Sequence, residues 1–321
     1  MKKIIIKTAI VSIVVLVFPL LLTLLLTNQG NKYNAVDIFD FEIYYETNGT
    51  EETLAFDQYL MGIVAANMPA GYDIEALKTQ AVIARTYALY NISLLSHDDP
   101  NKTRFATSEL GLSYISMDSL EQFWGSNDYV NYFSKIENAV TSTANEVITY
   151  EDDLILPVFF YTGCGYTRAA SDAWGIDIPY LISVSSKQDV TSTDYLKISE
   201  YAVSDLVALL YSHYNNLDIS EDKFFEDVIV TERDIIDYVL KINLGSQTVS
   251  GEEFAKVVGL NSSHFYIDDY EGKVRIICNG VGHGVGLSQY GANAMAGEGY
   301  PYNEILNHYY PGTELKNMKE D

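Results

Sequence analysis

Residues 8–27 carry the strongest hydrophobic pattern in the chain, an almost unbroken run of Ile, Val, Leu and Phe that follows lysines at positions 2, 3 and 7. A helix of about 20 apolar residues spans a hydrocarbon core of about 30 Å, and the lysines favour a cytoplasmic N-terminus. No small-residue cleavage site follows the run, so an uncleaved anchor is favoured over a cleaved signal peptide. We therefore expect a cytoplasmic tip at 1–7, a transmembrane anchor at 8–27, a linker at 28–35 and an extracytoplasmic domain at 36–321, held in the cell membrane by a single pass.

Beyond the linker, the spacing of apolar residues predicts a strand followed by helices. Residues 36–46 alternate as in a first strand, and residues 54–66 have helical spacing. Asp73 is suited to cap a second helix, with Glu75 in its first turn. Its apolar stripe, Leu77, Ala81, Ala84 and Ala88, predicts that most of this helix is packing. Two further helices are predicted at 118–125 and 128–143.

The second half of the chain mixes short strands with short helices. Strands at 147–150 and 154–161 predict a hairpin, although Pro157 weakens the second strand. A helix at 204–214 and strands at 228–231 and 238–244 follow. Ser250 is expected to cap a helix at 251–258 that Gly259 closes, before a last hairpin at 265–268 and 273–278. This mixture predicts an α+β fold with segregated helices and mostly antiparallel strands.

A glycine-rich run, GVGHGVGLSQYGANAMAGEGYPYNEILNHYYPG, occupies residues 280–312. Glycine has no Cβ, so the backbone can bend sharply and a bulky ligand can approach the main chain. His283 lies among four glycines and is suited to face a cleft, with Ser288, Gln289 and Tyr290 close behind. A phosphate-binding loop is excluded because the run contains no lysine. The structural alternative is a tight corner between a strand and a helix.

The charge and composition of the chain disfavour some classes of binding partner. The net charge of −24 argues against nucleic acid and against anionic lipid surfaces, and it favours solubility. The chain is 48% hydrophobic over 321 residues, enough for a sizeable core. It contains 26 tyrosines, whose rings stack on sugars and whose hydroxyls hydrogen-bond them, although most are expected in the core or on the surface.

Three segments, in this order, carry a resemblance to a known family. They are residues 62–90 (GIVAANMPAGYDIEALKTQAVIARTYALY), residues 159–183 (FFYTGCGYTRAASDAWGIDIPYLIS) and the glycine-rich run. Together they resemble the stage II sporulation protein D (SpoIID/LytB) family of peptidoglycan-cleaving lytic transglycosylases. The resemblance covers roughly residues 40–315, with a variable middle at about 190–250. It implies the SpoIID-like lytic transglycosylase fold, peptidoglycan glycan strands as ligand and a membrane-bound amidase complex as partner.

The same resemblance implies a catalytic acid that this chain lacks. Lytic transglycosylases protonate the glycosidic oxygen with a carboxylic acid, and the muramic C6 hydroxyl then closes a 1,6-anhydro ring. The family places a glutamate immediately before Met-Pro, where this chain has Asn67. An amide can hydrogen-bond the glycosidic oxygen but cannot donate a proton at neutral pH, and a positioned acid is worth about 10²–10⁴-fold in rate. Asp73 and Glu75 are the candidates for a relocated acid, although a helix cap and a first-turn charge explain them better.

Other residues in the three segments indicate that the glycan-binding groove of the family is retained. The resemblance implies that Arg85 and Tyr180 lie in the catalytic site. It also implies that Thr162, His283, Ser288, Gln289 and Tyr290 bind the substrate. Relatives usually carry a basic residue where this chain has Ile182. A basic side chain at position 182 would help to position the catalytic acid, and it loses that purpose when the glutamate is absent.

The two cysteines leave several outcomes open. Cys164 and Cys278 can form one disulfide outside the membrane or remain free thiols. Some relatives carry zinc ligands near residues 161–168, but this chain has Tyr161, Gly163 and Tyr166 there. Four zinc ligands are therefore hard to assemble, and we expect no metal and no other cofactor.

These observations predict a membrane-anchored protein of sporulation, acting during engulfment, that grips glycan strands and works with a partner amidase. Substitution of the acid predicts weak cleavage or none, and so a possible pseudoenzyme. One alternative is an active transglycosylase with a relocated acid. The other is a purely structural member of a membrane complex that remodels the wall.

Overall fold

The computed structural model describes residues 41–47 and 49–319. The expected tip, anchor and linker lie outside these residues, as do residues 36–40 of the expected first strand. No helix within the described part is long and apolar enough to cross a membrane.

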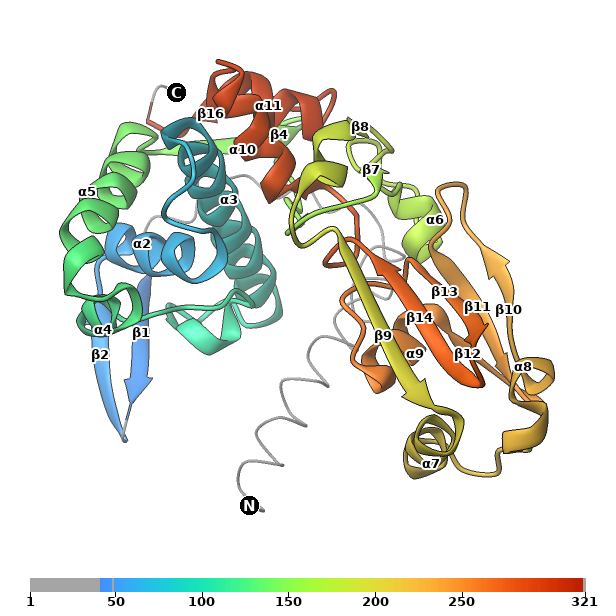
Figure 1. Ribbon diagram of the computed structural model, residues 1–321. Coiled ribbons are helices and arrows are strands. Elements are labelled where there is room, and N and C mark those ends of the chain that lie inside the picture. Colours follow the sequence, from blue (N-terminus) through green and yellow to red (C-terminus); the bar gives the residue numbers. More distant parts are fainter. Residues whose placement is uncertain (1–40, 48, 320–321) are drawn as a thin grey trace.

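Two separate hydrophobic cores divide the described chain into two lobes. The first core, which defines the helical lobe, draws its buried residues from positions 43–181 and 285–310. The second core, which defines the sheet lobe, draws its residues from positions 206–278. Figure 1 shows the lobes as two arms that extend from a common region around α10, α11, β7 and β8. The sheet lobe is therefore an insertion between the second segment and the glycine-rich run.

The helical lobe is built on a long central helix. Asp73 caps α3 (Ile74–Asp98) by accepting a hydrogen bond from the Glu75 amide at 2.9 Å, as predicted. The predicted apolar stripe of α3 is completely buried, at Leu77, Ala81, Ala84 and Ala88. The other predicted helices are also confirmed, as α2 (Phe56–Asn67), α4 (Leu120–Trp124) and α5 (Ser126–Ser142). A small sheet completes the lobe, with β1 (Glu42–Thr47) between antiparallel β2 (Thr50–Leu54) and parallel β3 (Arg104–Ala106).

The predicted hairpin after α5 is shorter than expected. Strand β4 (Glu146–Tyr150) pairs with β5 (Asp153–Leu154) on one side and β16 (Glu314–Asn317) on the other. The expected second strand at 154–161 is wrong because pairing with β4 ends at Leu154, and Pro157 has no backbone N–H to continue a ladder. The chain then forms β6 (Phe159–Phe160), which pairs in parallel with β15 (Leu287–Ser288). This pairing brings the second segment against the glycine-rich run.

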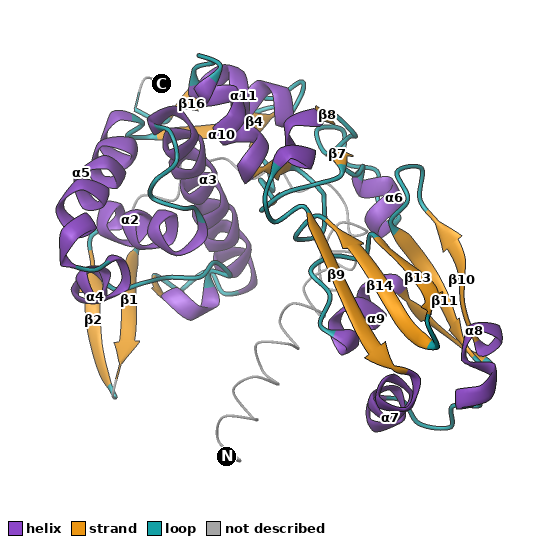
Figure 2. Ribbon diagram, viewed as in Figure 1, coloured by secondary structure: helices purple, strands orange, loops and turns teal. Residues whose placement is uncertain are grey.

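Short elements connect the lobes. After β6 come β7 (Gly165–Tyr166), α6 (Ala170–Trp174) and β8 (Ser185–Ser186), and β7 pairs with β8. The chain returns from the sheet lobe into α10 (Gln289–Gly297) and α11 (Tyr302–Tyr309), which lie beside this region in Figure 2.

The sheet lobe contains two small antiparallel sheets. One has the order β13 (Phe265–Tyr270), β14 (Lys273–Asn279), β9 (Leu196–Ala202), and the other has the order β10 (Val228–Arg233), β11 (Val239–Leu244), β12 (Gln247–Ser250). The helices are α7 (Val203–His213), α8 (Phe224–Asp227) and α9 (Gly251–Val258), the last capped by Ser250 and closed by left-handed Gly259 as predicted. The predicted mixed α+β class with mostly antiparallel strands is thus confirmed.

Arg168 ties the two lobes together. It lies in the second segment with only 1% of its surface exposed. Its Nε donates to Asp234 Oδ2 at 2.7 Å, and its Nη1 donates to Glu252 Oε1 at 3.0 Å. The guanidinium also lies over the ring of Tyr238, 4.4 Å from the centroid. Because a buried cation without partners is costly, this cluster holds the sheet lobe to the second segment.

Candidate functional site

Asn67, at the acid position, ends α2, and its side-chain nitrogen makes two hydrogen bonds. Its Nδ2 donates to Ile63 O at 2.8 Å and to Ser113 O at 2.9 Å. Both partners are carbonyl oxygens, which accept only, so the nitrogen of the amide must face them. The two N–H bonds are therefore committed, and the amide links α2 to the segment that follows Leu112.

Gln289 joins the glycine-rich run to the first segment at this point. Its Nε2 donates to the backbone oxygen of Asn67 at 2.7 Å and to Gln80 Oε1 at 3.0 Å. Gln289 is 3% exposed, so it positions the site rather than facing solvent. The buried Gln80 Nε2 has no hydrogen-bond partner among the described residues. The structure thus brings Asn67 and Gln289 together, as the resemblance implied.

Three tyrosines, Tyr72, Tyr161 and Tyr290, form what we call the tyrosine cluster. The Tyr290 amide donates to Tyr161 O at 2.9 Å, which aligns the two residues. The Tyr161 hydroxyl donates to Asp194 Oδ2 at 3.1 Å, and the Tyr290 hydroxyl lies 3.2 Å from Thr191 Oγ1. Burial is the main cause of the raised pKa of Tyr72, and the neighbouring Tyr161 and Tyr290 raise it further. All three side chains are half-buried.

Tyr72 and Tyr161 were not among the sequence-predicted site residues. Both lie within the two segments that carry the resemblance. The signal that pointed to them was the abundance of tyrosine, which by itself does not say which of 26 side chains gather at one place.

A buried carboxyl, Asp189, organises the backbone beneath the cluster. It is completely buried and accepts hydrogen bonds from the Gly163 amide at 2.8 Å and from Ser288 Oγ at 2.7 Å. Burial raises the pKa of Asp189, and these hydrogen bonds oppose the rise. Asp189 lies outside the three segments, and nothing in the sequence singled it out.

Ser288 and Thr162, predicted to bind substrate, are instead completely buried. Ser288 Oγ accepts a hydrogen bond from the Gly291 amide at 3.1 Å and so caps α10. Thr162 exchanges backbone hydrogen bonds with Val281, and its hydroxyl donates to Asp189 O at 3.3 Å. Both residues therefore position the segments that carry Gln289 and Tyr161, and neither can contact a ligand in this structure.

His283 packs near the junction of the lobes. Its Nδ1 accepts a hydrogen bond from the Val285 amide at 3.1 Å, which places the proton of the neutral ring on Nε2. The ring lies 5.9 Å from those of Phe160 and Trp174. Burial and the charge of Arg168 lower the pKa of His283 to about 4. His283 is thus a neutral, half-buried side chain, and its contacts are with these junction residues rather than with Asn67.

Arg85 does not face the cleft, which corrects the expectation from the resemblance. It is 1% exposed and donates to Thr143 O at 2.7 Å, to Glu146 O at 3.2 Å and to Val140 O at 3.1 Å. These carbonyls belong to the end of α5 and the turn after it, where the last four helical carbonyls lack helical partners. Burial lowers the pKa of Arg85 to about 10, which its nearest carboxylates oppose.

Tyr180 also makes its contacts with other parts of the protein itself. Its hydroxyl accepts a hydrogen bond from the Leu156 amide at 3.1 Å, and its ring lies 5.6 Å from that of Tyr150. Burial raises the pKa of Tyr180 to about 12. It therefore satisfies a backbone donor that strand pairing leaves free. The nearby Ile182 is 44% exposed.

The two candidates for a relocated acid have structural partners. Glu75 Oε1 pairs with Lys78 Nζ at 2.7 Å, and Glu75 Oε2 accepts from the Tyr302 amide at 2.9 Å. Asp73 caps α3, as described above. Both carboxylates thus accept hydrogen bonds from backbone amides at the N-terminal ends of α3 and α11.

No group of three or more metal-ligating side chains occurs in residues 41–47 and 49–319. Cys164 and Cys278 are free thiols, and burial raises the pKa of Cys164 to about 12. Cys164 Sγ lies 3.7 Å from Tyr238 Oη and 3.6 Å from Asn279 O.

Comparisons with known proteins agree with the three-segment resemblance. The family model SpoIID, described as stage II sporulation protein, matches residues 44–150. Stage II sporulation protein D of Bacillus amyloliquefaciens is 33% identical over 274 residues, which make up 85% of this chain and 77% of that protein. The protein of the same name from Bacillus subtilis strain 168 is 31% identical over 274 residues, 85% of this chain and 78% of that protein. An amidase enhancer of Bacillus subtilis is 28% identical over 303 residues, which cover 80% of this chain and 40% of that protein.

Proposed function

Because this chain belongs to the stage II sporulation protein D family, we propose that it binds peptidoglycan glycan strands during sporulation and cleaves them weakly or not at all. In this proposal the protein is held in the cell membrane by residues 8–27. The domain that follows acts on the outer side, during engulfment.

The observation that carries the proposal is the pair of hydrogen bonds that the Asn67 side chain donates. Its amide occupies the acid position, and both of its N–H bonds are committed to the carbonyls of Ile63 and Ser113. A carboxylic acid at this place would face two acceptors that favour its protonated form, which is the form a general acid needs. The surroundings are thus suited to an acid, whereas the side chain present has no proton to transfer. Loss of that step costs about 10²–10⁴-fold in rate.

Three carboxyls near the site do not replace it. Glu75 and Asp73 are engaged as described, and Asp189 is completely buried and cannot reach a glycosidic oxygen. These contacts support weak cleavage or none.

Binding needs planar hydrogen-bonding groups and ring faces rather than a proton donor. The tyrosine cluster supplies three half-buried rings beside Asn67 and Gln289, and tyrosine combines an apolar face with a polar hydroxyl. Arg85 and Tyr180 do not enter this proposal because they bond backbone groups in the interior. The net charge of −24 gives no long-range attraction to an anionic wall, so we expect a modest affinity.

We also propose that a membrane-bound wall amidase is the partner. The similarity to a protein named amidase enhancer supports this partner class. A protein that holds glycan strands beside an amidase would raise the local concentration of substrate without cleaving it.

One observation favours a second candidate, an active transglycosylase. Asp194 is an exposed carboxyl that accepts a hydrogen bond from Tyr161 of the tyrosine cluster. Its exposure and its bond to the tyrosine cluster make it the candidate to act in place of the missing glutamate. If Asp194 has this role, Asp194→Asn abolishes formation of anhydro ends.

Co-sedimentation with purified peptidoglycan tests the binding proposal. The full chain in mild detergent should pellet with the wall material, and Tyr290→Ala should reduce the bound fraction. Tyr300→Ala is the matched control, because Tyr300 is 42% exposed and lies outside the tyrosine cluster. A folded wild-type protein that stays in the supernatant, yet captures the amidase, would favour the purely structural alternative.

A further inference from the structure

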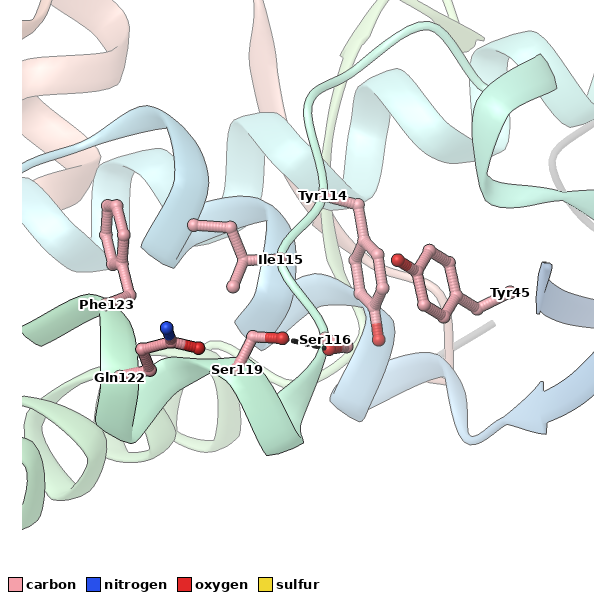
Figure 3. A pocket seen from close by; sticks show the side chains of 7 residues that line it. All are labelled: Tyr45, Tyr114, Ile115, Ser116, Ser119, Gln122 and Phe123. Carbon is pink, nitrogen blue, oxygen red and sulfur yellow. Dashed lines mark hydrogen bonds between the residues drawn. The ribbon is translucent and has the colours of Figure 1, made fainter. Parts of the chain in front are cut away.

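A pocket of about 490 Å³ opens on the helical lobe, away from the tyrosine cluster in sequence. Tyr45 of β1 lines one side, and the segment from Tyr114 to Phe123 lines the rest. Figure 3 shows the rings of Tyr45 and Tyr114 facing each other at one end, with Phe123 and Gln122 at the other. The motifs that carry the family resemblance supply none of these side chains.

The aromatic end of the pocket contains an unused hydrogen-bonding group. The rings of Tyr45 and Tyr114 lie 5.2 Å apart, and Tyr59 lies behind Tyr114 at 5.7 Å. The hydroxyl of Tyr114 is buried and has no hydrogen-bond partner among the described residues. Because this hydroxyl is buried, the Tyr114 ring rather than its hydroxyl is available to a ligand in the pocket.

The other end of the pocket is polar and exposed. The hydroxyls of Ser116 and Ser119 lie 2.8 Å apart, and the Gln122 side chain is exposed beside them. Phe123 is 57% exposed, which is unusual for so large an apolar ring. Ring faces combined with hydroxyl and amide groups are suited to a sugar ring, which has apolar faces and a polar edge.

Charge near the pocket excludes an anionic ligand. Burial raises the pKa of Tyr114 to about 12, and Glu52 and Asp118 are the charged groups that raise it further. Glu52 faces Tyr45 across the β1–β2 ladder. None of the lining residues is Lys or Arg. A neutral ligand therefore fits better than a phosphate or a free carboxylate.

The pocket wall is hydrogen-bonded to α2, the helix that carries Asn67. Ser113, which accepts the Asn67 hydrogen bond, immediately precedes Tyr114, and the Ile115 amide donates to Gly62 O at 3.3 Å. Gly62 and Asn67 are separated by about 7.5 Å along the axis of α2. A Cβ on Gly62 would lie 2.3 Å from the Tyr114 ring, so this glycine lets the pocket wall lie against α2.

We propose that this pocket is a second saccharide subsite, which takes a neutral N-acetylated hexosamine of the same glycan strand that the Asn67 site holds. The proposal rests on the proposed glycan-binding function. Tyr45 and Phe123 provide ring faces at the two ends of the pocket, and the Gln122 side chain bonds the acetamido group. Asn67 positions the pocket wall through Ser113.

Titration with N-acetylglucosamine oligomers of two to six sugars tests the subsite, using the full chain in mild detergent. Phe123→Ala and Gln122→Ala should each weaken binding of the hexamer by roughly 3- to 10-fold, the loss expected for one contact. The melting temperature of both variants should stay within a few degrees of wild type. Phe225→Ala is the matched control, because Phe225 is 37% exposed on the sheet lobe and should leave binding unchanged.

The outcomes separate the subsite from the function on which it rests. Hexamer binding that falls with Tyr290→Ala but not with Phe123→Ala or Gln122→Ala overturns the subsite and leaves the function standing. A folded wild-type protein that binds neither the hexamer nor glycan strands overturns both. A photoreactive hexamer should also label the peptide containing residues 114–123, and labelling confined to other peptides overturns the subsite.

Discussion

The side-chain amide of Asn67 donates to the backbone carbonyl of Ser113 across 2.9 Å, and the same nitrogen donates to Ile63 O across 2.8 Å. The side chain that stands at the proposed acid position thus also holds the segment that lines the neighbouring pocket. Because an ionised carboxylate cannot donate to a carbonyl, the change at this position affects structure as well as chemistry.

Asn67→Asp should destabilise the protein by about 1–3 kcal/mol at pH 7, because two carbonyls lose their donor and face a carboxylate. Urea unfolding measures this loss. Asn101→Asp, at an exposed position, is the control and should stay close to wild type. Equal stabilities of Asn67→Asp and the control would show that the two hydrogen bonds contribute nothing.

Arg85→Met should lower stability by about 2–3 kcal/mol or more, since a charged donor that serves three buried carbonyls is lost. Under conditions where the variant is folded, its affinity for glycan strands should match that of wild type. A stable Arg85→Met protein that binds glycan strands more weakly than wild type would indicate that Arg85 belongs to the ligand site.

His283 should make stability depend on pH. Its folded pKa of about 4 lies below its ordinary value of 6.5, so the unfolded chain binds the extra proton more readily. The stability that the neutral His283 contributes is complete above about pH 6.5 and is lost as the pH falls towards about 4, by about 3 kcal/mol in total.

His283→Asn keeps an acceptor for the Val285 amide but does not titrate, so its free energy of unfolding should fall less between pH 7 and pH 4.5. His264, whose pKa burial also lowers, is present in both proteins and cancels in the comparison. Identical pH profiles would mean that His283 is not held neutral by the fold.

Binding to wall material should depend on the tyrosine cluster and only weakly on salt. Tyr161→Ala and Tyr290→Ala should each reduce the affinity by roughly 3- to 10-fold, as expected for loss of one ring contact. The net charge of −24 makes electrostatic attraction to an anionic wall unfavourable, so raising the salt from 50 to 300 mM should not release the protein. Release by moderate salt would indicate a charge-driven contact elsewhere.

The pattern of residues predicted most of the helices and their caps. Periodic apolar residues and local caps determine these features, as at Asp73 and Ser250, where each side chain bonds an amide two or three residues ahead. Such contacts are short in sequence and depend on residue type alone.

The interior polar contacts could not be predicted in the same way. Arg85 bonds carbonyls 55 to 61 residues away, and Asp189 accepts from Ser288 at a separation of 99 residues. An arginine that caps a distant helix and one that binds a ligand look the same in a sequence. The pocket was missed because its lining residues lie outside the segments that carried the resemblance.

The most direct measurement of the central claim is the formation of 1,6-anhydro ends. Denuded glycan strands are incubated with the wild-type protein and with Asn67→Glu, and the products are weighed by mass spectrometry. The account predicts almost no anhydro product from wild type and an increase of about 10²-fold or more from Asn67→Glu, because the new acid faces the carbonyls of Ile63 and Ser113. If Asn67→Glu stays inactive, the double variant Asn67→Glu/Ile182→Lys reverses both departures from the family pattern and becomes the deciding variant. Robust wild-type cleavage that persists in Asp73→Asn/Glu75→Gln would contradict the account and show that the acid lies elsewhere.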